Sequence, residues 1–324
     1  MLSYVGRRIL QMIPVFIGVT ILLFILRTPG VLPGGNGVAL ITGERAISPA
    51  LYSEIVKENA LDKPIYYQYV RWVDHLFHGD LGQSYQLKRP VTTVLLQKFP
   101  NTLRLALVAI IIEAIIGVLA GVLSAVKRYS FWDVLVTLST SILVALPVFW
   151  LGMVLQIIFG FKFKQWGLPY LPISGMTSSD FPSWAHYILP AVTLASISTA
   201  YAARITRSQL LEVMGQDYMR TAAAKGLTSG QVIYRHGMKN AMIPVVTYLG
   251  LDLGAMVGGT ILTEVVFNWP GIGYTIYRAI LSRDWPIVMG AVVIVVILVM
   301  ILNLLVDISY AFLDPRIRYG RTAK

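Results

Sequence analysis

The chain has 324 residues, of which 56% are hydrophobic and only 13% carry a charge. Soluble domains usually contain about 25% charged residues, so this composition indicates a polytopic membrane protein and argues against a soluble domain. The formal net charge of +11 fits the enrichment of Lys and Arg in cytoplasmic loops and requires no nucleic-acid partner. Because the sequence contains no cysteine, disulfides, thiolate metal sites and cysteine nucleophiles are excluded.

Six apolar stretches are long enough to cross the hydrocarbon core of a bilayer, which takes about 20 residues. The N-terminal stretch has the basic start of a signal peptide, but its apolar run is too long and no small-residue cleavage site follows, so we expect a retained span. We therefore predict an all-α membrane protein with six transmembrane helices. The predicted spans are Ile9–Leu26, Leu103–Val126, Trp132–Phe159, Ala185–Ala203, Ala241–Phe267 and Trp285–Phe312.

The distribution of Lys and Arg predicts the orientation of these spans. With the N-terminus inside, the short loops rich in basic residues fall on the cytoplasmic side, as the positive-inside rule requires. Both termini are therefore expected in the cytoplasm. The predicted organisation is an N-terminal span (1–27), an extracytoplasmic helical segment (28–100), a five-helix core (101–313) with a cytoplasmic loop at 204–240, and a cytoplasmic tail (314–324).

The long extracytoplasmic segment carries signals for short helices. Ser48 followed by Pro49 is typical of an N-cap and the first residue of a helix. Aromatic and aliphatic residues then recur at helical spacing as far as Trp72, Leu76 and Phe77. We expect these helices to lie on the outer face of the protein.

The sequence offers little for catalysis or metal binding. It has neither a GxxxxGK[ST] phosphate loop nor a GxSxG motif, so ATP binding of the usual kind and serine hydrolase chemistry are not expected. His75 and His78 are spaced i, i+3 on a predicted helix and could share a metal ion, but no third ligand or Glu base accompanies them at a fixed spacing. We therefore predict no catalytic residue and no metal site.

Two acidic residues lie deep within predicted spans. Charged groups are costly in lipid and usually face a partner helix or a polar cavity. Glu113 and Asp252 are therefore candidates either for interhelical hydrogen bonding or for lining a translocation path, and the two interpretations are equally open. Pro147 should kink the third span. The neighbouring Phe149 and Trp150 could form a gate, although ordinary packing is the favoured interpretation.

The predicted cytoplasmic loop contains the sequence QDYMRTAAAKGLTSGQ, which is unusually polar and basic for this chain. Gly215 should end the preceding helix, and Asp217 is predicted to cap a helix of about two turns over Tyr218–Lys225. Gly226 can end that helix in the left-handed conformation.

Thr228 and Gln231 fit a capping box for a further helix that runs into the fifth span. The two-turn helix before it is too short to be stable alone and must be held by other parts of a protein. Its three alanines, Ala222–Ala224, give a surface without side-chain bulk, and Tyr218 and Arg220 are residue types enriched at interfaces. On these patterns, docking to a partner and a solvated connector are equally supported.

Four more motifs surround this loop at separate places along the chain. The loop itself reads DYMRTAAAKGL over Asp217–Leu227, and the others are GDLGQS at Gly79–Ser84, PNTLRLAL at Pro100–Leu107, ILTEVVFNWPGIG at Ile261–Gly273 and DPRIR at Asp314–Arg318. Together with six spans, these motifs resemble type I ABC importer permeases of the peptide and nickel class. The greatest likeness is to the B-type permease of dipeptide and oligopeptide systems.

The resemblance extends over almost the whole chain but departs from the general loop signature of such permeases. That signature is E-A-A, three residues, G, nine residues, I-x-L-P. Counted from Gly226, its first three positions hold Arg220, Thr221 and Ala222, and its last four hold His236, Gly237, Met238 and Lys239. The pattern of the peptide subclass, D-Y-x-R-T-A-x-A-K-G-L, is nearly intact.

The resemblance implies a pore subunit without catalytic activity or a cofactor of its own. It implies a homologous second permease, two cytoplasmic ATPase subunits that bind ATP and Mg, an extracytoplasmic solute-binding protein and the lipid of a bacterial or archaeal cytoplasmic membrane. The coupling helix that would dock on an ATPase comprises Asp217, Tyr218, Arg220, Thr221, Ala222, Ala223, Ala224, Lys225, Gly226 and Leu227.

The cargo is not specified by any residue. Di- or oligopeptides are the first expectation from the resemblance, and glutathione-type compounds or nickel and other metal chelates are the alternatives. An ion-coupled secondary transporter is a less favoured class, because neither an inverted repeat nor paired broken helices are evident. A membrane scaffold without transport activity fits the capped loop helix poorly.

Overall fold

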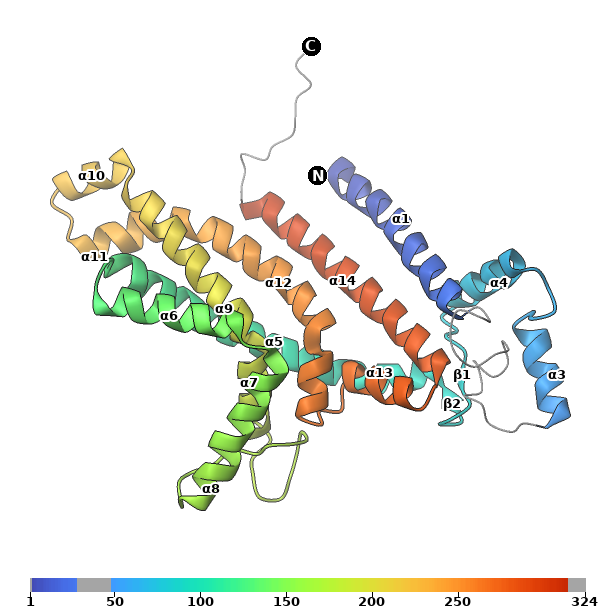
Figure 1. The fold of residues 1–324 in the computed structure, drawn as a ribbon. Coiled ribbons are helices and arrows are strands. Elements are labelled where there is room, and N and C mark those ends of the chain that lie inside the picture. The colour runs from blue at the N-terminus through green and yellow to red at the C-terminus, as the bar shows by residue number, and fades with distance from the viewer. Residues whose placement is uncertain (1, 28–47, 314–324) are drawn as a thin grey trace, which may run out of the picture. The chain divides into compact units, whose positions relative to one another are not determined.

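The computed structural model of the chain describes residues 2–27 and 48–313, and within them the fold is almost entirely helical (Figure 1). In chain order, the elements are α1 (Leu2–Arg27), α3 (Pro49–Glu58), α4 (Ile65–Phe77), β1 (Gln83–Ser84), β2 (Arg89–Pro90), α5 (Val91–Val126), α6 (Phe131–Ala145), α7 (Val148–Leu155), the π-helical η1 (Gln156–Lys162), α8 (Phe163–Gln165), α9 (Ala185–Met214), α10 (Asp217–Ala224), α11 (Ser229–Gln231), the π-helical η2 (Val232–Gly237), α12 (Met238–Val266), α13 (Ile272–Leu281) and α14 (Trp285–Leu313).

Six helical stretches in the described part of the chain are long and apolar enough to cross a membrane, which confirms the predicted fold class. They are Val5–Leu26, Val91–Val126, Val148–Gln165, Ala185–Met214, Ser229–Val266 and Trp285–Ile308. Several begin earlier or end later than the hydropathy pattern predicts. In particular, α5 begins at Val91, so the predicted boundary at residue 100 lies inside a helix.

The third predicted span, Trp132–Phe159, is wrong as a single kinked helix. The structure ends α6 at Ala145 and begins α7 at Val148, with Leu146 in the extended conformation at φ −89° and ψ 135°. Proline disfavours helical geometry in the residue before it and lacks the N–H that would continue the ladder, so Pro147 separates two helices. Pro190, by contrast, lies inside an uninterrupted α9.

The chain forms two compact units. One comprises Met1–Leu103 with Asn268–Met300, and the other comprises Arg104–Phe267 with Ile301–Lys324. The long helices α5 and α14 each contribute to both units. The predicted DPRIR tail motif, at residues 314–318, lies outside the described residues.

In the first unit, the predicted cap of α3 is confirmed, because the Ser48 side chain accepts a hydrogen bond from the Leu51 amide at 3.3 Å. The motifs PNTLRLAL and WPGIG, far apart in sequence, are joined there. The Trp269 indole donates to the Asn101 carbonyl at 3.1 Å, and the Ile272 amide donates to the Thr102 hydroxyl at 2.8 Å. The second of these bonds fixes the start of α13, a helix that the sequence did not predict.

In the second unit, α9 is the central helix and packs against α6, α7 and α12. Its contact with α5 depends on small residues. A Cβ atom on Gly117 would lie 2.7 Å from Ala202 Cβ, and one on Gly121 would lie 2.5 Å from the Ala203 carbonyl oxygen. Glycines four residues apart therefore let the two helix backbones approach closely, as is usual in membrane helix pairs.

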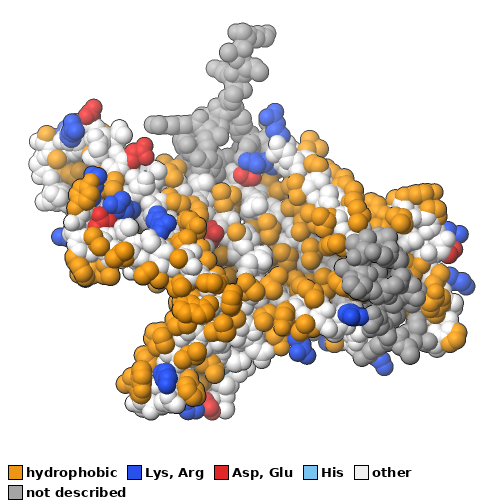
Figure 2. Space-filling model, viewed as in Figure 1, with side chains coloured by type: hydrophobic (Ala, Val, Ile, Leu, Met, Phe, Trp, Pro, Cys, Tyr) orange, Lys and Arg blue, Asp and Glu red, His pale blue; other side chains and the backbone are white. Residues whose placement is uncertain are grey.

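The polar side chains of the second unit gather at its ends. Figure 2 shows Lys, Arg, Asp and Glu side chains over α10 and its surroundings and again at the tip of α8, with mainly hydrophobic side chains between them. In Figure 1, α10 and α8 lie at opposite ends of this unit. This is the distribution expected for a helical unit that spans a bilayer and meets water at both ends.

Candidate functional site

The segment between α9 and α12 folds into a short helix followed by a capped turn. Helix α9 continues beyond the predicted end of its span and stops at Met214, with Gly215 as its C-cap. Helix α10 then spans Asp217–Ala224. The predicted capping role of Asp217 is wrong: Gln216 occupies the N-cap position in extended conformation, and no side chain caps the helix. Asp217 instead places its carboxylate in the first turn, where the helix dipole favours negative charge.

The carboxyl end of α10 follows the prediction closely. Gly226 has a φ of +82°, a conformation that residues with a Cβ adopt only at a cost. Both bonds of the predicted capping box are present, because the Thr228 hydroxyl accepts from the Gln231 amide and the Gln231 side chain accepts from the Thr228 amide. Thus α10 is bounded by well-defined backbone geometry although it has only 8 residues.

One face of α10 is buried within its own chain. Met219 and Ala222 are 4% and 7% exposed, and they form a hydrophobic cluster with Val232, flanked by Val213, Met214 and Leu227. Gly237 leaves room for this packing, since a Cβ atom there would lie 3.2 Å from the Met219 Cε. The prediction that the three alanines form one open surface is therefore wrong for Ala222, which faces inward.

The other face of α10 is open to solvent. We call it the docking face, after the role that the sequence analysis expects of it, and it consists of Tyr218, Arg220, Thr221, Ala223 and Ala224. The Asn240 side chain donates to the Tyr218 hydroxyl at 2.9 Å and thereby ties the face to α12. Because a short helix is marginal alone, the inward cluster and this hydrogen bond hold a smooth surface in a fixed position. Lys225 and Gly226 are also exposed, whereas Leu227 is half-buried.

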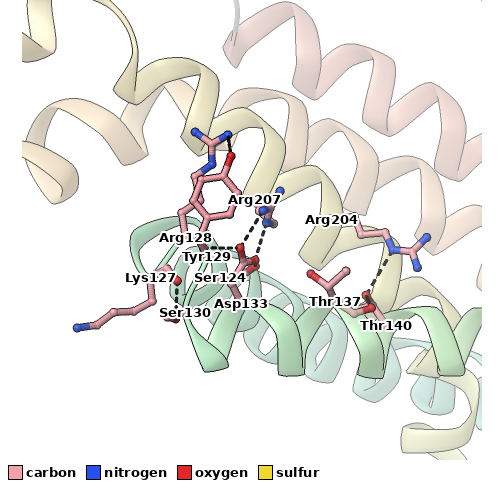
Figure 3. Close-up of polar contacts among 10 residues, drawn as sticks. All are labelled: Ser124, Lys127, Arg128, Tyr129, Ser130, Asp133, Thr137, Thr140, Arg204 and Arg207. Atoms are coloured by element: carbon pink, nitrogen blue, oxygen red, sulfur yellow. Dashed lines mark hydrogen bonds and ion pairs between the residues drawn. The ribbon is translucent and has the colours of Figure 1, made fainter.

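An ion pair with a buried carboxylate connects three helices of the same unit (Figure 3). Asp133, near the start of α6, accepts two hydrogen bonds from the Arg207 guanidinium of α9, at 2.9 and 3.0 Å. It also accepts from the Ser124 hydroxyl of α5 and from the Tyr129 amide at 2.9 Å. The Asp133 side chain is only 7% exposed, and that of Arg207 is 32% exposed. We call Asp133, Arg207, Ser124 and Tyr129 the polar clamp.

A second arginine on α9 also contacts α6, but more weakly. Arg204 lies nearly one turn before Arg207 and donates to the hydroxyls of Thr140 and Ser141 at 3.4 and 3.0 Å. These are neutral acceptors, so Arg204 lacks the charge-assisted, bidentate bonding that makes the Arg207 contact strong. Figure 3 shows both arginines pointing from α9 toward α6.

The sequence prediction missed the polar clamp because it ended the fourth span at Ala203 and considered the arginines at the start of the cytoplasmic loop at 204–240 only as markers of orientation. The structure places Arg207 within α9. A signal was present, however. Asp133 sits at the start of an apolar stretch, and the positive-inside rule puts that start on the same side of the membrane as Arg207. An unpaired carboxylate near a membrane span is costly. Asp133 could therefore be expected to pair with a cation on the same side, such as Arg207.

The structure brings together one pair of the predicted pathway residues. Glu113 of α5 is fully buried, and the carboxyl group of Asp252 on α12 faces it closely enough for the two to interact. Among the described residues, no hydrogen-bond partner is found for either carboxylate oxygen of Glu113. Phe149 and Trp150 lie on α7, just after Pro147, and are 42% and 44% exposed.

The two histidines considered as metal ligands each have an acidic neighbour. His75 Nδ1 lies 3.2 Å from the Asp80 carboxylate, and His78 Nδ1 lies 3.7 Å from that of Asp74. Within residues 2–27 and 48–313, no group of three or more His, Cys, Asp or Glu side chains is arranged to hold a metal ion.

Comparison with known proteins identifies the family of this chain. Residues 117–319 match the model of the binding-protein-dependent transport system inner membrane component, and residues 1–106 match that of its N-terminal part. The chain belongs to this permease family. The family resemblance inferred from the sequence motifs is therefore confirmed, and the permease is a multi-pass membrane protein.

Two curated relatives align along their full length. The permease is 39% identical over 350 residues to the dipeptide transport system permease protein DppB of Escherichia coli (strain K12), covering 99% of this chain and 100% of that protein. It is 38% identical over 321 residues to the glutathione transport system permease protein GsiC of Escherichia coli O6:H1, covering 98% and 100%. Both relatives are permease subunits.

Solved structures support the fold. An inward-facing structure of the MetNI methionine ABC transporter contains a chain that aligns with a TM-score of 0.54 and 20% identity. The alignment covers 68% of the permease and 96% of that chain. At this identity the likeness concerns the fold alone.

Proposed function

We propose that this permease is the membrane subunit of an ATP-driven importer for short peptides and forms half of the translocation pathway. The single observation that carries the proposal is the docking face of α10. It is smooth at Ala223 and Ala224, carries Tyr218 and Arg220 as anchors, and is held from behind by its own chain. Such a face suits a shallow cleft on another protein, because side-chain bulk does not keep the backbone away.

The partners in this proposal are a second, homologous permease, two cytoplasmic ATPase subunits and an extracytoplasmic solute-binding protein. ATP and Mg bind to the ATPase subunits, and this chain supplies no catalytic residue. Both termini and the docking face lie on the cytoplasmic side of a bacterial or archaeal cytoplasmic membrane. The family match and the distribution of basic residues support this arrangement.

The proposed mechanism is a movement of whole helices. When ATP closes the ATPase pair, α10 is carried with the ATPase surface on which it sits. Helix α10 follows α9 after only two residues, and Arg207 of α9 binds Asp133 of α6, so α9 and α6 move together. ATP binding can shift the permease between inward-facing and outward-facing states only because ATP binds the closed ATPase pair better.

Peptide is the proposed cargo because the names of both curated relatives refer to the transport of peptides or of a peptide-like compound. The dipeptide relative is 39% identical and the glutathione relative is 38% identical, and glutathione is itself a modified tripeptide. Di- or oligopeptides are therefore the first choice, and a glutathione-type compound is the second. A nickel or other metal chelate remains a further alternative, and ion-coupled secondary transport is the least supported.

The proposal is tested by isolating the tagged permease in mild detergent and identifying co-purified proteins by mass. Recovery of a second permease and ATPase subunits is expected. Ala223→Glu should reduce ATPase recovery and peptide uptake by about ten-fold, which corresponds to about 1.4 kcal/mol of docking free energy. Ser229→Glu is the matched control, because it adds the same charge at an exposed position just outside α10.

The outcomes separate the competing functions. If Ala223→Glu and Ser229→Glu behave alike, the docking face is assigned to the wrong surface. If the wild-type chain is recovered alone and still accumulates solute without ATP, the importer proposal is overturned and ion-coupled transport replaces it. Competition of labelled dipeptide uptake by unlabelled glutathione then ranks the two cargo classes.

A further inference from the structure

Helix α4 in the first unit carries an apolar stripe that its own fold leaves exposed. Tyr66, Val70 and Phe77 are 72%, 63% and 78% exposed, and the half-buried Val73 lies between them. The spacing is i, i+4, i+7 and i+11, so the four side chains share one face of the helix. We call them the α4 stripe. Large exposed apolar patches mark contacts with another protein or with a membrane.

A different face of α4 packs against the first span. The Tyr69 hydroxyl lies 3.0 Å from the Thr20 hydroxyl of α1, and the rings of Tyr69 and Trp72 lie 5.4 and 5.9 Å from that of Phe24. Trp72 and Leu76 also pack against the cluster of Leu23 on α1 with Met289 and Val293 on α14. Helix α4 is therefore anchored to the last turns of α1 and the first turns of α14.

These contacts place α4 beside the end of an apolar helix. The candidate span of α1 ends at Leu26, and Thr20 is six residues before that end, or about 9 Å along a helix that rises 1.5 Å per residue. The tip of the Tyr69 side chain therefore reaches past the end of the apolar stretch, while Trp72 meets Phe24 close to that end. Amphipathic helices at a bilayer surface lie at this level and bury their apolar face by about 5–10 Å.

We propose that α4 lies in the interfacial region of the bilayer, at the leaflet where α1 ends, with the α4 stripe in contact with lipid. The lipid-facing surface of α1 continues toward the same end through exposed Leu22 and Ile25. Tyr66 suits this level, because its ring can meet acyl chains while its hydroxyl reaches the head groups, and the purely apolar Val70 and Phe77 suit the acyl chains themselves.

The charged residues of α4 border the stripe or lie away from it. Arg71 is exposed on a different face, so it can remain in water or among head groups while the stripe meets lipid. Asp74 is also exposed, but it follows Val70 by four residues and therefore lies at the edge of the stripe. A protein partner would be expected to provide a surface for these charges as well. Among the described residues, the α4 stripe itself carries no charge to orient such a partner.

The absence of cysteine from the natural sequence permits a direct test by spin labelling. Single cysteines are placed at Tyr66, Val70 and Phe77, one at a time, and the matched control is Arg71→Cys on another face of the same helix. All four side chains are exposed, so the labels should not disturb packing. Each variant is assembled with its partner subunits in nanodiscs of phosphatidylethanolamine and phosphatidylglycerol.

The measurement is the collision of each label with oxygen, which concentrates in lipid, and with a water-soluble nickel chelate. Oxygen collisions should exceed those of the chelate at the three stripe positions, and the order should reverse at the Arg71→Cys control. Excess chelate collisions at the stripe would overturn the proposal. Low collision rates with both reagents, or a loss of oxygen collisions when a solute-binding protein is added, would also overturn it and assign the stripe to a protein contact.

Discussion

Helices α10 and α4 are both held in place by packing on one face, and they differ in the side chains of their exposed face. Each is a short amphipathic helix, of 8 and 13 residues. Each is held by side chains on one face: Met219 and Ala222 in α10, and Trp72 and Leu76 in α4. Their free faces have opposite character. That of α10 carries small side chains and single anchors, whereas that of α4 carries bulky aromatic and aliphatic side chains.

The difference indicates how the outer face of an anchored helix selects its environment. A small-residue face has little apolar area to bury, so it gains stability only from a partner whose cleft fits the backbone closely. A bulky apolar face gains about 25 cal/mol for each Å² removed from water whatever the shape of its surroundings, so a fluid acyl region suffices. On this argument the free face of α10 suits the proposed protein partner, whereas that of α4 suits lipid.

The comparison is tested most strongly at the polar clamp, because α10 can transmit force only if α9 is fixed to its neighbours. Arg207→Gln leaves Asp133 buried without its cation, and breaking such a pair costs about 3 kcal/mol in the free energy of unfolding. We expect lower thermal stability in detergent and, in the assembled transporter, ATP hydrolysis that is no longer matched by uptake. The number of ATP molecules hydrolysed per solute is measured in proteoliposomes.

Arg204→Gln is the control for this prediction. It removes an arginine from the same helix, facing the same α6, but loses only bonds to the hydroxyls of Thr140 and Ser141, which are worth about 1 kcal/mol. Should Arg207→Gln leave the ratio of hydrolysis to uptake unchanged while ATPase subunits still bind, the polar clamp would have a purely structural role.

A substitution at the C-terminal end of α10 should have a smaller effect on ATPase binding, and the same kind of change in α4 should have none. Gly226→Ala forces a residue with a Cβ into a φ of +82°, at a cost of about 1 kcal/mol. The strain falls on the last turn of α10, so ATPase recovery should decrease while the rest of the fold is retained. Co-purification yield and circular dichroism together measure the two effects.

Gly230→Ala is the matched control, since a Cβ atom there meets nothing within 4 Å and its φ is not positive. Equal ATPase recovery for the two variants would mean that the geometry after α10 does not contribute to docking. In α4 no such dependence is expected, because a helix in contact with fluid lipid tolerates small shifts of its end.

Local signals were predicted from the sequence more reliably than contacts between distant residues. The caps at Ser48 and Thr228 and the left-handed Gly226 depend on neighbours within three or four positions, so the sequence pattern contains the whole interaction. The inward face of α10 could also have been predicted, because Met219 and Ala222 are spaced i, i+3 and therefore lie on one side of the helix. The prediction used the run of alanines and overlooked that periodicity.

The features that sequence analysis missed depend on distant partners or on competing local rules. Asp133 and Arg207 are 74 positions apart, and no single window contains both. The start of α13 is fixed by a hydrogen bond to Thr102, 170 positions away. The break at Pro147 was local, but the apolar run on both sides was long enough for one span, and that length outweighed the restriction on Leu146.

The smallest expected effect is that of Glu113→Gln on peptide uptake. This variant tests whether a buried residue takes part in transport as well as the anchored helices. Glu113 is fully buried and interacts with Asp252. Glu113→Gln keeps the shape of the side chain and removes one carboxyl group of the pair. Its amide N–H can donate a hydrogen bond to the Asp252 carboxylate. We expect peptide uptake near the wild-type rate and a stability change within about 1 kcal/mol. Glu113→Ala, which leaves a cavity, should cost about 2 kcal/mol. Loss of uptake in Glu113→Gln with unchanged thermal stability would contradict the packing role and place an ionisable group on the pathway.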